Sequence, residues 1–355
     1  MLPQLARLTR RVPAAGPDAL AVAVYSDATG RSRVAKESGF EGVACVDDAA
    51  RLLDVVCDVW TVTRLGWAER WARGLLSFVL SMQESDGRWL NFITNWEGDR
   101  NREGITSETG ENFWHARALA GVTSAWITFG DERARDALWL GLDHALTKPA
   151  PADVRAIHLE LAGRLVAAGT TELREPARRW AEELATCRNG DVLKNSDEEV
   201  GPPHLWAHIQ EGALAAAASL LEEPALLDIA VRSAQALVIP AVNGGFAMPA
   251  ATPYDVASCV WSLDRLQTAT GDERWGGIAT EARAWFDGRN PARSPVFDPR
   301  RGSVADGIDG TRVSGNSGAE ANIVAAIALY SRTLEQARAL EDPLESPPTD
   351  PGPPD

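Results

Sequence analysis

The chain has 355 residues, 45% of them hydrophobic, and a formal net charge of −15. This length suits two average domains or one large closed architecture, and the charge disfavours nucleic acid and anionic lipid as partners. No apolar stretch reaches the roughly 20 residues that span a bilayer, and the N-terminal arginines follow a short apolar stretch rather than precede a long one. We therefore expect no secretion signal, no membrane helix and a cytoplasmic protein.

The chain begins with Leu2, Leu5, Leu8 and Val12 at helical spacing, which predicts a short N-terminal helix. Five helical pairs follow. Their first members are predicted at 48–64, 111–129, 153–168, 206–221 and 255–270, and their second members at 67–82, 131–147, 172–187, 224–238 and 272–287. An eleventh helix is predicted at 318–338. The N-terminal helix could pair with it and complete six hairpins.

Two turns between paired helices repeat each other. Thr128–Arg133 and Thr270–Arg274 each end one helical pattern with glycine and begin the next with an aspartate N-cap. The last residues, 341–355, are too rich in proline and acid to fold. We expect a single domain over 1–340 and a disordered tail over 341–355.

Links within the pairs are short, whereas those between pairs are long, at about 83–110, 188–205, 239–254 and 288–317. Long loops on one end of a helical array predict a pocket there. The first helices of successive pairs begin at unequal intervals along the chain, which favours a toroid over a regular solenoid. The fold is therefore expected to be all-α, a toroid of helical hairpins. Loop residues expected to line its pocket include Trp89, Asn91 and Tyr254.

Asp47 and Asp48 begin the first long helix. Adjacent carboxylates repel each other, so one of them could stay protonated near neutral pH and serve as a general acid. An N-cap aspartate followed by an acid that the helix dipole favours explains the same pair.

A second group holds Glu108, Glu111 and His115. Glu111 and His115 are four residues apart and would share a helix face, presenting an acid and an imidazole to one pocket. His115 fits a core histidine equally well. Glu108 is a loop carboxylate suited to sugar contact or catalysis, or an ordinary acid that precedes a helix.

A third group holds His204, Trp206, His208 and Glu211. The spacing of the two histidines and Glu211 predicts one polar line along a helix, with Trp206 beside it. The line would contact a sugar or form a buried polar seam. It lacks the His-Glu-x-x-His pattern of zinc proteases, and the cysteines have no paired spacing. We expect no metal, no disulfide and no cofactor.

Asp255 and Glu320 also begin predicted helices. Thr252 and Ser317 precede them by three residues, which is the pattern of a capping box. Capping could be their whole role, or they could also face the pocket. Of the thirteen tryptophans, Trp89, Trp96, Trp114 and Trp206 are predicted near the loop end, where indole rings could stack on sugars.

Several motifs together resemble the six-hairpin glycosidase superfamily, and within it a bacterial branch associated with glycosyltransferases. They are Val24–Ser26, Cys45–Arg51, His115–Leu119, Gly271–Trp275, Phe297–Gly302, Asp306–Gly307 and Gly318–Glu320. The resemblance implies an (α/α)6 toroid and carbohydrate chemistry. The branch usually has asparagine in place of Ala49 and glutamine in place of Ser317, within Asn316–Glu320. If those side chains bind sugar hydroxyls, this protein recognises another ligand or has lost activity.

The resulting hypothesis is a glycoside hydrolase that uses a carboxyl pair drawn from Asp48, Glu108, Glu111 and Asp255. The resemblance implies inversion, with carboxyls about 6.5–9.5 Å apart. Substrate contacts would come from Asp47, Trp89, Asn91, His115, Trp206, His208, Glu211, Tyr254, Asn316 and Glu320. A non-catalytic glycan-binding or scaffold partner of a glycosyltransferase is the alternative. A sugar epimerase is a third possibility, less favoured because the chain has only five histidines.

Overall fold

The computed structural model describes residues 1–32 and 42–344. Within these ranges the chain forms two units, each with its own helical core. Unit 1 comprises Met1–His144, Asp298–Asp306 and the chain from Gly315 onward; unit 2 comprises Ala145–Phe297 and Gly307–Ser314. Most of the predicted disordered tail, from residue 345, lies outside the described residues.

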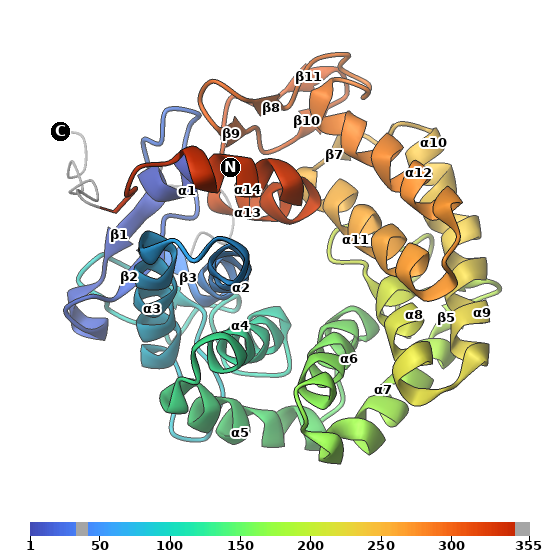
Figure 1. Cartoon of the computed structure of the whole chain (residues 1–355), viewed down its shortest axis with the longest axis horizontal. Coiled ribbons are helices and arrows are strands. Elements are labelled where there is room, and N and C mark those ends of the chain that lie inside the picture. Colours follow the sequence, from blue (N-terminus) through green and yellow to red (C-terminus); the bar gives the residue numbers. More distant parts are fainter. Residues whose placement is uncertain (33–41, 345–355) are drawn as a thin grey trace. The chain divides into compact units, whose positions relative to one another are not determined.

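Unit 1 is built on the helix α2, which packs against α3, α4 and α13 (Figure 1). Its helices are α1 (Leu2–Leu8), α2 (Val46–Thr63), α3 (Gly66–Ser81), α4 (Phe113–Phe129), most of α5 (Glu132–Thr147), α13 (Ala319–Ala328) and α14 (Tyr330–Ala339). The predicted N-terminal helix is confirmed, and it packs on α13 and α14. The predicted helix 318–338 is divided at Leu329, whose φ of −104° and ψ of 41° are not helical.

The contact between α2 and α4 is close because α4 has a glycine where the two helices meet. A Cβ at Gly121 would lie 2.9 Å from the carbonyl oxygen of Ala50. Only glycine lets the backbones approach this far. This contact brings the first turns of α2 and α4 close enough for Arg117 to reach Asp47.

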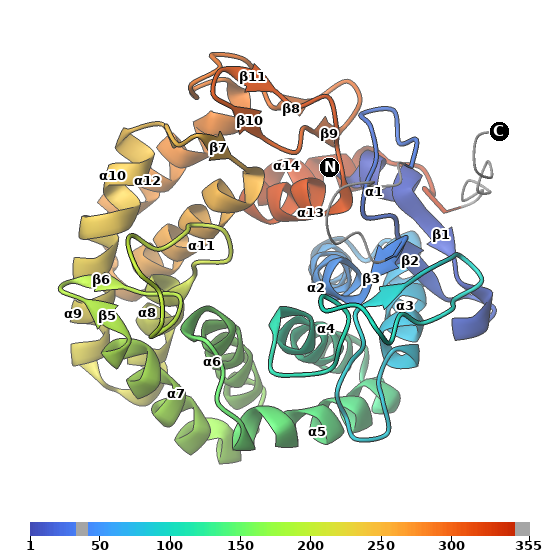
Figure 2. The same ribbon diagram turned by 180° about the vertical axis from the view of Figure 1, so that it is seen from behind.

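Short strands in unit 1 fix where α2 begins. β1 (Thr9–Arg11) pairs with β2 (Leu20–Val22), and β3 (Ala44–Cys45) pairs antiparallel with β4 (Phe92–Ile93), with Cys45 opposite Phe92 (Figure 2). β3 leads directly into α2, whose N-cap is Cys45: its Sγ accepts a hydrogen bond from the Asp48 amide at 3.4 Å. The N-cap role expected for the aspartates is therefore wrong, and both lie within the first turn.

Unit 2 packs α8 between α6 and α11, with α7, α9 and α12 against their partners (Figure 1). The helices are α6 (Ala152–Ala167), α7 (Arg174–Thr186), α8 (Gln210–Leu221), α9 (Pro224–Ser233), α10 (Ile239–Asn243), α11 (Pro253–Thr270) and α12 (Glu273–Arg283). The short strands are β5 (Arg188–Asn189) with β6 (Val192–Leu193), and β7 (Ala250–Ala251) with β10 (Ile308–Asp309) and β11 (Arg312–Val313). β8 (Phe297–Asp298) and β9 (Ser303–Val304) form a ribbon where the chain returns to unit 1.

A π-helical turn at Ala234–Val238 joins α9 to α10 and extends the second member of that pair beyond the predicted end at 238. Pro240 follows this turn; proline lacks an amide hydrogen and crowds the preceding turn, so a wider turn accommodates it. The continuous stretch Pro224–Asn243 has 20 residues and a mean hydropathy of 1.6. It is the one helix in the described ranges that could cross a membrane by length and composition, a property that core helices of soluble proteins share.

The repeated turns behave as their sequences predict. Gly130 and Gly271 end their helices in the left-handed region, with φ of 64° and 66°. Asp131 and Asp272 then accept hydrogen bonds from the first amides of the next helices. Of the tryptophans not predicted near the loop end, Trp71, Trp180 and Trp285 are fully buried in the core, whereas Trp139 is 40% exposed.

Candidate functional site

The first turn of α2 holds the aspartate pair of unit 1. The backbone amide of Val46 donates to the Asn91 carbonyl at 2.8 Å, and the Asp47 amide donates to Asn91 Oδ1 at 3.1 Å. The Asn91 amide group donates to the Thr106 carbonyl. Asn91 is therefore used to position the start of α2, and with 4% exposure it does not present its amide to a ligand as expected.

The two aspartates have different partners. Arg117 pairs with Asp47, and Arg51 Nε lies 3.7 Å from it. Burial opposes ionisation of Asp47, but these two guanidinium groups hold its pKa below the usual value. Asp48 Oδ1 accepts from Arg51 Nη2 at 2.8 Å. Burial, together with the charges of Glu320 and Asp47, outweighs that contact and raises the pKa of Asp48 to about 7.

Arg51 joins Asp48 to the start of α13. Its Nη2 also donates to Glu320 Oε2 at 3.0 Å, and the Glu320 side chain is 51% exposed. The capping box predicted for Ser317 and Glu320 is wrong: the N-cap is Gly318, which makes no side-chain cap. The Ser317 hydroxyl is buried and accepts instead from Asn322 at 2.9 Å. Glu320 is thereby free of a capping role.

Asp306 and Tyr25 complete this group. Asp306 Oδ1 accepts from the Gly318 amide at 2.6 Å, yet burial, aided by the charge of Glu320, raises the pKa of Asp306 to about 6. Tyr25 is 42% exposed. Burial of its phenol, followed by the charge of Asp48, raises the pKa of Tyr25. We call Asp47, Asp48, Arg51, Asp306 and Glu320 the unit 1 carboxyl group.

Unit 2 contains a buried histidine and carboxylate. His208 Nδ1 lies 2.7 Å from Asn195 Oδ1, and Nε2 lies 3.1 Å from Glu211 Oε1. Ser233 donates to the same Glu211 oxygen at 2.6 Å. Burial alone raises the pKa of Glu211, but His208 and the two hydrogen bonds hold it below its usual value. This carboxylate is therefore ionised at neutral pH.

The predicted polar line along α8 is wrong in its geometry. α8 begins at Gln210, and Ala207 has a positive φ of 57°, so the segment before it is not helical. His204 instead stacks on Trp206 with ring centres 3.9 Å apart and planes at 6°, and Tyr254 lies 6.4 Å from Trp206. Trp206 is 40% exposed. It is the one predicted platform tryptophan with a largely exposed ring among the described residues.

Asp255 forms the predicted capping box with Thr252, whose amide and hydroxyl donate to Asp255 Oδ2 at 2.8 and 2.7 Å. It is 4% exposed, and burial raises its pKa despite the contacts with Thr252. Besides this cap, Asp255 accepts a hydrogen bond from the Trp206 backbone, which joins the start of α11 to the His204 and Trp206 rings.

Two other candidates, Trp89 and Glu108, do not gather with these groups, and Asn316 contacts the unit 1 carboxyl group only through its backbone. Trp89 is fully buried, and its Nε1 donates to the Val79 carbonyl, so it packs in the core and cannot stack on a sugar. Glu108 is exposed in a loop, where Asn112 donates to its backbone carbonyl. Asn316 is exposed, and its carbonyl accepts from the Asp306 amide.

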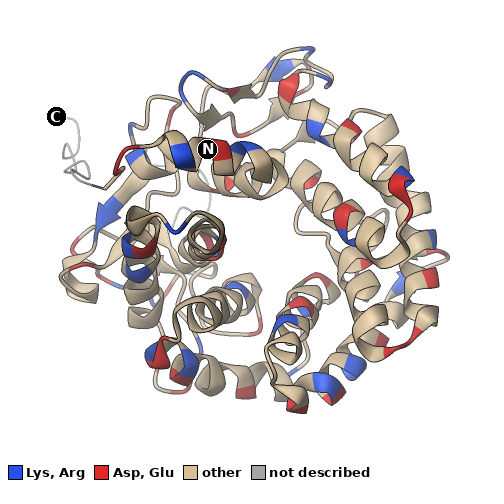
Figure 3. Cartoon of the chain, viewed as in Figure 1, with Lys and Arg blue, Asp and Glu red and all other residues tan. Residues whose placement is uncertain are grey.

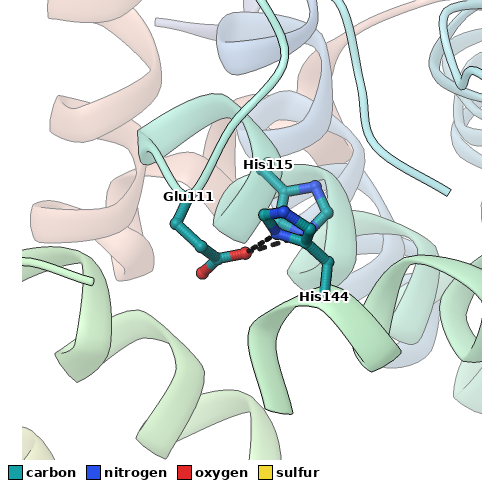
Figure 4. Close-up of side chains that lie close together, drawn as sticks. All are labelled: Glu111, His115 and His144. Atoms are coloured by element: carbon teal, nitrogen blue, oxygen red, sulfur yellow. Dashed lines mark hydrogen bonds and ion pairs between the residues drawn. The ribbon is translucent and has the colours of Figure 1, made fainter. Parts of the chain in front are cut away.

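Glu111 and His115 meet a partner that sequence analysis did not identify. Glu111 precedes α4 rather than beginning it, and its Oε1 lies 2.6 Å from His144 Nδ1 and 3.4 Å from His115 Nε2 (Figure 4). His144 belongs to α5, 33 residues further along the chain. No local pattern links it to Glu111, so only the packing of α5 on α4 could reveal it.

The arginines of unit 1 were also missed as site residues. Arg51 and Arg117 appeared only within the motifs Cys45–Arg51 and His115–Leu119. Their spacing to the aspartates could have signalled Arg51, which is three residues after Asp48. Over the described residues of both units, Lys and Arg positions are interspersed with Asp and Glu positions along the helices (Figure 3).

Comparisons with known proteins identify the fold. No protein-family model and no curated protein matched the chain. Among solved structures, cellobiose 2-epimerase from Spirochaeta thermophila has a TM-score of 0.71 and 13% identity, covering 94% of each chain. A sugar epimerase from a ruminal bacterium has a TM-score of 0.70 and 12% identity, covering 93% of this chain and 95% of that one.

A third similar structure is an α-1,6-mannanase of Salegentibacter sp., with a TM-score of 0.57 and 13% identity, covering 88% of this chain and 95% of that one. It is an inactive variant with two adjacent aspartates replaced by asparagine, bound to α-1,6-mannotriose. The fold expected from the sequence is confirmed: the chain has the all-α (α/α)6 toroid fold of these structures.

Proposed function

We propose that the protein is a carbohydrate-active enzyme, and more specifically a glycoside hydrolase whose general acid is Asp48. One observation carries the proposal: the two adjacent aspartates have different surroundings, which shift their pKa values in opposite directions. Arginines keep Asp47 ionised, whereas burial raises the pKa of Asp48 to about 7. Environments that separate the pKa values of neighbouring carboxyls are typical of acid–base sites.

The second carboxyl of the proposed reaction is Glu320. Its side chain is half exposed, so a sugar can reach it. Asp48 Oδ1 and Glu320 Oε2 contact the same Arg51 nitrogen at 2.8 and 3.0 Å. They therefore lie within about 6 Å of each other, closer than the carboxyls of inverting glycosidases at about 6.5–9.5 Å. This separation favours retention, with Glu320 as nucleophile, over the inversion that the resemblance implied.

In this reaction Asp48 donates its proton to the leaving glycosidic oxygen while Glu320 attacks the anomeric carbon. Water then displaces Glu320 and returns a proton to Asp48. Arg51 positions both carboxyls. The similar mannanase supports the assignment, since its inactive variant lacks two adjacent aspartates.

A screen of α- and β-linked oligosaccharides for released reducing sugar tests the proposal. Asp48→Asn should abolish hydrolysis, and Asp58→Asn, the same change at an exposed position of α2, should retain it. Hydrolysis at an unchanged rate in Asp48→Asn would remove the assignment. Glycan binding without turnover in the unmodified protein would favour the non-catalytic partner of a glycosyltransferase instead.

A sugar epimerase or isomerase is the second candidate. Its candidate acid–base pair is His208 and Glu211. Both ring nitrogens of His208 face acceptor oxygens, so the imidazole must first release the Nε2 proton to Glu211 before it can take a proton from a carbon beside a carbonyl and return one to the other face. The similarity to two epimerases points the same way. Such a reaction leaves the mass of the sugar unchanged in H₂O, whereas in D₂O the sugar takes up deuterium. Loss of that exchange in His208→Gln, with hydrolysis absent throughout, would favour this candidate.

A further inference from the structure

We propose that Glu111, His115 and His144 of unit 1 form a binding site for a transition-metal dication, with Zn²⁺ as the best fit. One ligand atom from each residue can be chosen so that all three lie within 4.8 Å of one another. Figure 4 shows both imidazoles beside the Glu111 carboxylate. The site is separate from the unit 1 carboxyl group and does not depend on carbohydrate activity.

Three different elements supply these side chains. Glu111 comes from the loop before α4, His115 from the first turn of α4, and His144 from the last turn of α5. The position of His115 is fixed because Asn112 caps α4 by accepting from the His115 amide at 3.0 Å. The ring of His115 is held between Trp89 and His144, at centroid distances of 5.4 and 5.5 Å. Such anchoring means that a metal would meet ligands already in place.

His115 is the side chain that most needs a further partner. It is fully buried, and neither ring nitrogen makes a hydrogen bond of good geometry, although the Gly141 backbone lies close enough to favour a ring N–H. Buried polar atoms are nearly always satisfied, because an unsatisfied one costs about 1–3 kcal/mol. A metal bound to Nε2, on the side of Glu111, would satisfy one of the two nitrogens.

The charge state of His115 suits a ligand. Burial, followed by the charge of His144, lowers the pKa of His115 to about 3. The start of α4 also disfavours a cation there. Asp86 and Arg88 are the other charged groups whose fields reach the ring, and they pair with each other at 2.5 Å. His115 is therefore neutral at pH 7 and has a lone pair for a metal.

The donor set and the distances favour zinc. Two imidazoles and a carboxylate suit Zn²⁺ better than Ca²⁺ or Mg²⁺, which prefer oxygen. With bonds of about 2.1 Å, tetrahedral ligands stand about 3.4 Å apart. Glu111 Oε1 and His115 Nε2 are 3.4 Å apart. The 2.6 Å contact with His144 Nδ1 must lengthen by about 0.8 Å to reach that separation.

Metal binding also requires the proton of His144 to be in the right place. A proton on Nδ1 is donated to Glu111, so this nitrogen binds metal only when the ring carries its proton on Nε2. The side chain of His144 is 20% exposed, which lets water exchange that proton. The same exposure provides an entry path and leaves the fourth position open to water, as in sites with three protein ligands.

The test is metal binding by the full chain after treatment with a chelator. Isothermal titration with ZnCl₂ should give one site per chain. CoCl₂ should give the visible absorption bands of tetrahedral cobalt, and Zn²⁺ should displace them. His144→Gln, at a partly exposed position that tolerates the change, should lower the affinity at least about 100-fold. His204→Gln, which changes a histidine of unit 2, is the control and should bind Zn²⁺ as tightly as the unmodified protein.

His115→Gln and Glu111→Gln provide a second pair of variants, with folding checked by circular dichroism. Weak binding in the folded variants supports the site. No saturable zinc binding in the unmodified protein, or equal affinity in His144→Gln, overturns the proposal. Neither result bears on hydrolysis by Asp48, so the two proposals succeed or fail separately.

Discussion

Replacing Asp48 with asparagine tests the protonation of this buried carboxyl without requiring a substrate. The pKa of Asp48 rises from 3.8 in the unfolded chain to about 7 in the folded protein. Between these values the folded state keeps a proton that the unfolded state releases, so this group makes folding less favourable as pH rises from about 4 to about 7. The pKa of about 7 already includes the opposing effect of Arg51, whose charge lowers the pKa of Asp48.

The size of the effect follows from the pKa. A rise from 3.8 to about 7 corresponds to at most about 4 kcal/mol, since one pKa unit is worth about 1.4 kcal/mol. Asparagine keeps a carbonyl oxygen for Arg51 but cannot ionise. The free energy of unfolding of Asp48→Asn, relative to the unmodified protein, should therefore increase by up to about 4 kcal/mol from about pH 4 to about pH 8.

Urea denaturation at several pH values across this range measures the difference. Subtracting the free energy of unfolding of the unmodified protein from that of the variant cancels the titration of groups distant from Asp48. Asp58→Asn is the matched control and should show a difference that does not vary with pH in this way. A pH-independent difference for Asp48→Asn, or one that decreases as pH rises, would refute the buried, protonated state of Asp48.

The hydrolysis rate should decline as pH rises through about 7, because the general acid Asp48 must be protonated; a rate that keeps increasing above pH 8 would contradict this role. Proton NMR of the first product should show retained anomeric configuration, and inversion would exclude Glu320 as nucleophile. Arg117→Met should raise the pKa of Asp47 and destabilise the fold by about 3–5 kcal/mol, since it leaves a buried carboxylate without its main partner; urea denaturation checks this. Gly121→Ala should cost about 1–3 kcal/mol because its Cβ meets the Ala50 carbonyl, whereas Gly277→Ala, with no atom within 4 Å of its Cβ, should be neutral or stabilising.

Local signals predicted those features that depend on neighbours in the sequence. The glycine and aspartate turns and the Thr252 capping box formed as expected because capping involves only three or four residues. The same pattern at Ser317 was misleading. Asn322, five residues further along, donates to the Ser317 hydroxyl, and Glu320 pairs with the distant Arg51. Capping patterns thus predict helix starts better than the roles of their side chains.

For the candidate sites, too, the sequence predicted features that depend on neighbouring residues but not those that depend on distant ones. The adjacent carboxylates suggested that one of them stays protonated through mutual repulsion. The pKa values of Asp47 and Asp48 are shifted in opposite directions, but burial is the main cause for Asp48 and the charge of Asp47 adds little. Which of the two is ionised depends on Arg117, which comes from α4. His144 could not be associated with Glu111 from spacing. The helical line from His204 to Glu211 was wrong because Ala207 has a positive φ, a conformation that alanine rarely adopts.

The ion pairs of Arg51 also have a consequence for synthesis of the chain. Arg51 and Glu320 are 269 residues apart, so Arg51 lacks the Glu320 carboxylate until α13 has been made. At about 5–20 residues per second, translation of that interval takes roughly 15–50 s. A nascent chain that ends before α13 would therefore carry Asp48 beside an arginine that lacks one of its partners. The proposed chemistry becomes available only after α13 has been made.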